Sequence, residues 1–253
     1  MSWLMRRINR TFGSPKRIGV HSRRLYKKHL KVMKFEKELE GPEAGKLLSD
    51  KKYLQKLQTT IKDDEELLMK SRQDLNKGYQ VLTEMVNHMK ADIPDDLEIE
   101  RYSQHILAAI SKNQHELTGF ARDLYRRGEA RSRDKARNFI GAANSEKKDD
   151  VLAKRGGKYL QMRFIQLESA ANKFFTDEIH GEAFTQLLGL LASLPADMKK
   201  EGQLLIDLEF HLKDFVKRLS EHATGNAVKT LDDIRRDLKR NEKLDFKEAR
   251  KAA

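Results

Sequence analysis

The titratable and nucleophilic residues of this chain do not have the types and spacing of any catalytic motif. The segment Arg155-Gly156-Gly157-Lys158 comes nearest to a phosphate-binding loop, but it lacks the first glycine and the Ser or Thr after the lysine. None of the eight histidines pairs with another at the i, i+4 spacing of a zinc site. Isolated histidines such as His105, His115 and His211 are expected at the surface or its boundary. We therefore expect a protein that is not an enzyme, with no metal and no other cofactor.

The sequence contains two blocks of basic residues that could bind an anionic partner. The formal net charge is +12, and residues 1–34 contain eleven Lys or Arg and no acidic residue. Residues 122–158 contain twelve basic and six acidic residues, which is also typical of a charged helix hairpin in solvent. Blocks of one sign indicate an anionic partner: lipid headgroups, nucleic acid or an import receptor. The candidate anion-binding residues are Arg6, Arg7, Arg10, Lys16, Arg17, Arg23, Arg24, Lys27, Lys28, Arg126, Arg127, Arg131, Arg133, Lys135, Arg137, Lys154, Arg155 and Lys158.

Residues 1–13 have the pattern of an amphipathic helix that lies in a membrane interface. The apolar residues fall on one arc, the arginines face away from it, and the tryptophan sits near the boundary. The candidate membrane-inserting residues are Trp3, Leu4, Met5, Ile8 and Phe12. Two alternatives remain open. The helix is also compatible with docking on the protein's own bundle, and residues 1–34 resemble a mitochondrial presequence in being Arg-rich and free of acids.

A heptad repeat of apolar residues organises the middle of the chain and predicts one long helix. The repeated positions, taken as the bundle core, are Leu47, Leu54, Ile61, Leu68, Leu75, Leu82 and Met89. A period of 3.5 residues predicts a helix that packs against a partner along one stripe. The second stripe is apolar at Leu57 and Met85 but polar at Asp64 and Ser71. We interpret that gap as a place where neighbouring helices splay or exchange partners.

The rest of the chain predicts further helices and no sheet. Ser22 is a candidate N-cap for a helix to about residue 40, and a second long helix follows Pro94. A third long helix is expected from Tyr159 to about Leu194, where Pro195 should end it. We divide the chain into an N-terminal helix (1–13), a long-helix bundle (14–222) and a C-terminal helix with a charged tail (223–253). Cysteine is absent, which excludes disulfides and fits a reducing compartment.

Three predicted long helices, an amphipathic N-terminal helix and a basic tip between the second and third helices together resemble a BAR domain of the N-BAR, amphiphysin-like type. Some fungal members open with Met-Ser-Trp and a basic stretch that ends Ile-Asn-Arg. This chain has Met1-Ser2-Trp3 and then Arg6-Arg7-Ile8-Asn9-Arg10, with two fewer residues between them. The resemblance implies three-helix protomers that pair antiparallel into a curved six-helix bundle. It also implies a cytoplasmic, peripheral membrane protein that senses or generates curvature on anionic lipid.

The expected partners are therefore an anionic membrane and a second copy of the chain, with a higher-order lattice on membranes as an extension. We expect an obligate antiparallel dimer, because three helices of one chain cannot cover the heptad stripe together with the partial apolar stripes at Ile99–Leu124 and Tyr159–Ile179. One alternative is a polymerising membrane scaffold of the phage-shock or ESCRT-III type. Another is a basic coiled coil that binds nucleic acid, which we rank below lipid because few aromatic residues lie among the basic ones.

Overall fold

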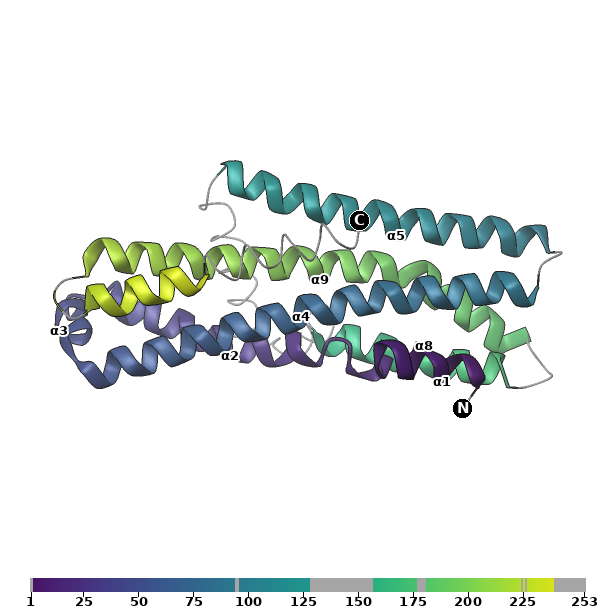
Figure 1. Cartoon of the computed structure of the whole chain (residues 1–253), viewed down its shortest axis with the longest axis horizontal. Helices are drawn as coiled ribbons and strands as arrows, with labels where there is room; N and C mark the ends of the chain where they lie inside the picture. Colours follow the sequence, from purple (N-terminus) through teal and green to yellow (C-terminus); the bar gives the residue numbers. More distant parts are fainter. Residues whose placement is uncertain are drawn as a thin grey trace.

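The computed structural model shows an elongated bundle of helices (Figure 1). It describes residues 2–93, 96–127, 157–176, 181–223, 225 and 227–238. No strand occurs in these ranges, so the prediction of an all-α fold is confirmed. None of the described helices is long and apolar enough to cross a bilayer.

The described helices run back and forth along the long axis of the molecule. In chain order they are α1 (Trp3–Phe12), the 3-10 helix η1 (Pro15–Arg17), α2 (Val20–Leu39), α3 (Ala44–Ser49), α4 (Lys51–Asp92), α5 (Leu97–Arg127), α8 (Gly157–Phe174), α9 (Gly181–His222) and a last helix at 227–238. Helices α1 and α2 follow one another along one side of α4, and α5 packs against α4 and α9 (Figure 1). Helix α8 packs against α9 and α2.

Helix α4 buries the heptad stripe predicted from the sequence. Six of its seven positions, Leu54, Ile61, Leu68, Leu75, Leu82 and Met89, are buried. Leu47 is the exception, because it lies in the separate short helix α3. The side chain of Asp50 accepts a hydrogen bond from the backbone N–H of Lys52 and caps α4. Because this cap starts a new helix, α4 does not extend back to Leu47.

The second stripe of α4 is also buried, although two of its members are polar. Leu57, Asp64, Ser71 and Met85 all face the core. The hydroxyl of Ser71 donates to the backbone oxygen of Leu67, and Asp64 bonds to a histidine of α2. Both polar residues of the gap are therefore buried with hydrogen-bond partners, and the interpretation that neighbouring helices splay or exchange partners there stays a prediction.

The heptad stripe is covered within one chain. Helices α1, α2, α5 and α9 all pack against α4, and the core is continuous from Leu4 and Ile8 to Leu231 and Ile234. The heptad stripe therefore gives no reason to expect a dimer, but Met162 and Ile165 of the third predicted stripe are exposed, and the dimer stays a prediction. The first and last helices belong to the same hydrophobic core as the bundle.

The third long helix predicted from the sequence is two helices in the structure. Helix α8 ends at Phe174, and α9 begins at Gly181 and continues through Pro195 to His222. A proline inside a helix removes one backbone hydrogen bond and costs about 3 kcal/mol. Leu191, Leu194 and Met198 around it are buried. Their burial offsets that cost, so the prediction that Pro195 ends the helix is wrong.

The start of α2 is fixed by a close approach of two glycines. Gly19 has a positive φ of 89° and precedes α2, so Ser22 is not the N-cap that we predicted; it is buried inside the helix. A Cβ on Gly157 would lie 2.4 Å from the backbone oxygen of Gly19 and 2.6 Å from the backbone nitrogen of Arg23. Only glycine fits there, so the first turn of α2 lies directly on the first turn of α8.

Candidate anion-binding surface

One face of α2 carries basic side chains that point into solvent. Five of them are exposed and have no ion-pair partner in the described part of the chain: Arg23, Arg24, Lys27, Lys31 and Lys34. Arg23 and Arg24 are adjacent and the others follow at steps of three and four residues, which places all five along one side of the helix. The opposite side of α2 is buried through Leu25, Val32 and Phe35. The solvent-facing side of α2 therefore carries a row of unpaired positive charges, while its other side packs on the bundle.

The basic residues before α2, Arg6 among them, are exposed, and several of them have partners. Arg7 lies 3.0 Å from Glu84, and Lys16 lies 3.2 Å from the buried Glu168. Arg10 and Arg17 are exposed and have no partner within the described ranges. Lys28 forms an ion pair with Asp63 on α4. These pairs reduce the charge available to an external anion.

The second predicted basic region lies mostly outside the described residues. The backbones of Arg126 and Arg127 belong to the end of α5, and Lys158 is exposed in the first turn of α8. The residues outside the described ranges are Arg131, Arg133, Lys135, Arg137, Lys154 and Arg155. The role predicted for this region stays a prediction.

Helix α1 is docked on the bundle through the face predicted to insert into lipid. Leu4, Met5 and Ile8 are fully buried, and Phe12 packs against the same core. The backbone N–H of Ser2 donates to Asn172 of α8 at 3.1 Å. This is the intramolecular docking that the sequence left open as an alternative. Insertion of these residues into lipid would require α1 to leave the bundle.

Trp3 is the one predicted insertion residue that faces solvent. Its side chain is 61% exposed, and its ring lies 5.4 Å from the ring of His88. The guanidinium of Arg7 lies 5.7 Å from the indole centroid. An exposed indole beside a cation suits an interface between water and headgroups.

A groove separates the basic face of α2 from α4 near the α3 end of the bundle. Its volume is about 580 Å³, and lysines from both helices line it. The floor contains Phe35 and Tyr53, whose rings meet edge to face with centroids 5.3 Å apart. Burial, and then the hydrogen bond from its hydroxyl to Glu38 at 3.0 Å, raises the pKa of Tyr53 well above its usual value. Tyr53 is therefore a neutral donor at physiological pH.

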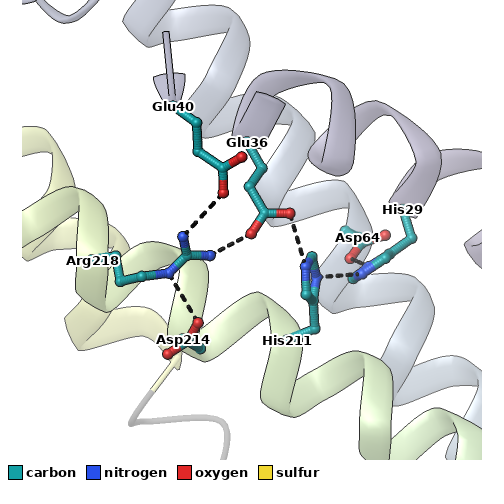
Figure 2. Close-up of polar contacts among 7 residues, drawn as sticks. All are labelled: His29, Glu36, Glu40, Asp64, His211, Asp214 and Arg218. Carbon is teal, nitrogen blue, oxygen red and sulfur yellow. Dashed lines mark hydrogen bonds and ion pairs between the residues drawn. The ribbon is translucent and has the colours of Figure 1, made fainter. Parts of the chain in front are cut away.

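The inner side of α2 is fixed by a buried polar cluster that joins three helices (Figure 2). His29 Nδ1 lies 2.6 Å from Asp64 of α4, and His29 Nε2 lies 2.9 Å from Nδ1 of His211 on α9. His211 Nε2 lies 3.1 Å from Glu36 of α2, and Glu36 also bonds to Arg218. His29, Asp64 and His211 are 0% exposed. The expectation that His211 lies at the surface or its boundary is wrong.

The geometry of the cluster fixes its hydrogen count. Asp64, His29, His211 and Glu36 are joined by three hydrogen bonds in series, and each bond needs one hydrogen. Two carboxylates and two imidazoles that share three hydrogens carry a net charge of −1. Arg218 next to Glu36 partly offsets this charge, and it also bonds to Asp214 at 3.0 Å and lies 3.5 Å from Glu40. Because the histidines are enclosed, the cluster is suited to setting the register of α2 on α4 and α9 rather than to binding a substrate.

A second buried polar contact lies closer to the start of α2. The hydroxyl of Tyr26 donates to Glu201 of α9 at 2.7 Å. Burial is the main cause that raises the pKa of Glu201 to about 7, and hydrogen bonds from Tyr26 and Ser22 lower it in part. Burial and the neighbouring Glu201 raise the pKa of Tyr26 well above its usual value. This glutamate therefore changes its charge near neutral pH, inside the core.

The described residues contain no group of three or more His, Cys, Asp or Glu placed to hold a metal ion. Comparisons of the chain with family models, curated proteins and solved structures found no match. The resemblance to BAR domains therefore stays a prediction, and the function is inferred from the surface itself.

Proposed function

We propose that this protein binds anionic membrane surfaces peripherally, through the basic residues of its first 34 positions. The observation that carries the proposal is the solvent face of α2, where Arg23, Arg24, Lys27, Lys31 and Lys34 are exposed without partners in the described part of the chain. The proposal is for a binding protein rather than an enzyme. Sensing or generation of curvature by an antiparallel dimer, which the resemblance to BAR domains implies, stays a prediction.

Electrostatics is sufficient for such binding. Each Lys or Arg close to an anionic leaflet contributes about 1 kcal/mol, and the attraction falls off within a Debye length of about 8 Å at physiological salt. Five aligned residues therefore give up to about 5 kcal/mol, which corresponds to weak and reversible attachment. Arg10 and Arg17, which are also exposed, extend the same segment. Because α2 is a formed helix packed on α4, its backbone does not have to be ordered when these charges bind.

Helix α1 has two states in this proposal. In the docked state Leu4, Met5 and Ile8 belong to the core, and only Trp3 among the predicted insertion residues faces a membrane. In the released state their apolar surface would enter lipid, but the core would lose the same contacts. Attachment through charge therefore precedes any insertion.

The observations favour lipid over nucleic acid. Binding of single strands uses aromatic side chains on which bases stack. The aromatic residues of α2, Tyr26 and Phe35, are both buried beneath its basic face. Lysines and arginines alone bind a duplex through its phosphates, so a duplex is the competitor that must be tested.

The experiment is co-sedimentation of the whole chain with vesicles. We expect binding to vesicles of phosphatidylcholine with phosphatidylserine, none to phosphatidylcholine alone, and loss of binding as salt rises. Duplex DNA at equal phosphate concentration is added as competitor. Binding to DNA with none to anionic vesicles would replace the membrane proposal with a nucleic-acid one.

A further inference from the structure

We propose that the groove between α2 and α4 binds clustered phosphate groups, and so gives the membrane binding its headgroup selectivity. The inference rests on the function proposed above and assigns it a specific site. The volume of the groove, about 580 Å³, lies in the range of small-molecule sites. The lysines at its rim are Lys28, Lys31, Lys34 and Lys56.

The groove is positive because its lysines outnumber its acids, and both acids already have partners. Four lysines and two carboxylates line it, which leaves a formal charge of +2. Asp63 forms an ion pair with Lys28, and Glu38 accepts the hydrogen bond of Tyr53. Lys31, Lys34 and Lys56 then have no partner in the described part of the chain. Three free ammonium groups from two helices face one opening.

The donors of the groove determine which anion suits it. The hydroxyls of Thr59 and Thr60 donate to backbone oxygens within α4, and the hydroxyl of Tyr53 donates to Glu38. The groups left for a ligand are therefore the carboxamide of Gln55 and the ammonium groups, which act as point charges without a fixed bonding direction. A phosphomonoester carries about −1.5 to −2 at neutral pH, so two of them exceed what one carboxylate or phosphodiester offers. The groove should recognise density of phosphate charge rather than ring stereochemistry.

A smaller neighbouring depression connects the groove with the basic face of α2. It has a volume of about 370 Å³, shares Lys28 and Lys31 with the groove, and adds Arg24 and Lys27. A phosphorylated headgroup in the groove would therefore lie beside the residues proposed to face the membrane. The same chemistry is offered by a polyphosphorylated lipid and by a soluble polyphosphate.

Two variants of the whole chain that each remove three charges test the inference. The groove variant combines Lys31→Ala, Lys34→Ala and Lys56→Ala. The matched control combines Arg10→Ala, Arg17→Ala and Arg23→Ala, which leaves the groove intact. All six side chains are exposed, so both variants should fold; circular dichroism checks this.

The soluble probe is inositol hexakisphosphate, measured by calorimetry at about 0.15 M salt, where screening suppresses long-range attraction. The membrane probes are phosphatidylcholine vesicles with either phosphatidylserine or phosphatidylinositol bisphosphate, at equal total charge. The groove variant should lose about tenfold or more in affinity for the soluble probe, since three cations are removed. It should also lose the preference for bisphosphate vesicles. The control should bind all vesicles less well but keep that preference.

The outcomes separate the two proposals. The groove proposal would be overturned if both variants lost affinity for the polyphosphate probes equally. It would also be overturned if the wild type neither bound inositol hexakisphosphate nor preferred bisphosphate vesicles to phosphatidylserine vesicles. The membrane function would stand in both cases. A wild type that binds no vesicle but binds the soluble probe, with loss only in the groove variant, would overturn the membrane function and support the groove as a site for a soluble polyphosphate.

Discussion

Replacing Glu201 by glutamine should remove a pH dependence of stability that lies inside the bundle. The pKa of this carboxyl is raised to about 7 in the folded protein, mainly by burial, from 4.5. Between those values the folded protein keeps a proton that the unfolded chain has lost. Stability therefore decreases as pH rises from 4.5 to 7, and it is fully present only below 4.5.

The size of the effect follows from the same shift. A difference of about 2.5 pH units, at 1.36 kcal/mol per unit, is about 3 kcal/mol of unfolding free energy. Urea unfolding of wild type and Glu201→Gln at pH 5 and pH 8 measures it. Between pH 5 and pH 8, the unfolding free energy of the wild type should fall by roughly that amount relative to that of Glu201→Gln. The glutamine side chain stays neutral at both pH values. Other titrating groups cancel in the comparison.

Two further variants sharpen the test of Glu201. The substitution Glu221→Gln removes an exposed carboxylate from the same helix and should leave the pH dependence of the wild type unchanged. The hydrogen bond from Tyr26 lowers the pKa of Glu201, so Tyr26→Phe should extend the decline in stability to higher pH. Parallel curves for wild type and Glu201→Gln would refute the argument from burial.

Three more predictions concern the contacts that hold α1 and α2. Ile8→Ala should lower the free energy of unfolding by about 2–5 kcal/mol in urea titrations, because Ile8 is fully buried; an unchanged midpoint would mean that α1 is not docked. Gly157→Ala should cost at least about 1 kcal/mol by the same assay, since its Cβ would lie 2.4 Å from the oxygen of Gly19; a neutral result would contradict the close approach. His29→Leu should cost about 3–5 kcal/mol because Asp64 is left buried without its partner. Adding Asp64→Leu should restore part of that loss, and additive losses would contradict the coupling.

The period of the sequence predicted the core of α4 well, because a seven-residue apolar repeat places one stripe of a helix against its neighbours. The first residue of α4 was harder to predict. Leu47 continues the repeat, yet the side-chain cap at Asp50 begins a new helix after it. Pro195 was predicted to end a helix, but α9 continues through it, because burial of its neighbours offsets the local cost of a proline inside a helix. In both cases a local signal competed with a tertiary one, and the sequence did not reveal which was stronger.

The candidate site was predictable in its charge and not in its geometry. The basic block at residues 1–34 was visible, and the spacing along α2 indicated a common face. An amphipathic pattern does not distinguish lipid from protein as the apolar partner, so the docking of α1 was one of three predicted outcomes, with membrane insertion and a presequence. His29 and His211 are separated by 182 positions, and no local spacing indicates that they meet. The one available signal was Asp64 in the second stripe, because a carboxylate in a core requires a partner.

The most direct test of the membrane proposal compares two charge reversals at about 0.1 M salt, where the Debye length is about 10 Å. One variant combines Arg24→Glu, Lys27→Glu and Lys31→Glu on α2. The other combines Lys77→Glu, Lys229→Glu and Arg235→Glu, which are exposed elsewhere and change the net charge equally. Both are sedimented with phosphatidylcholine–phosphatidylserine vesicles. We predict that the first variant loses binding and the second retains most of it. Equal binding by the two variants would contradict the assignment of the membrane-binding surface to α2.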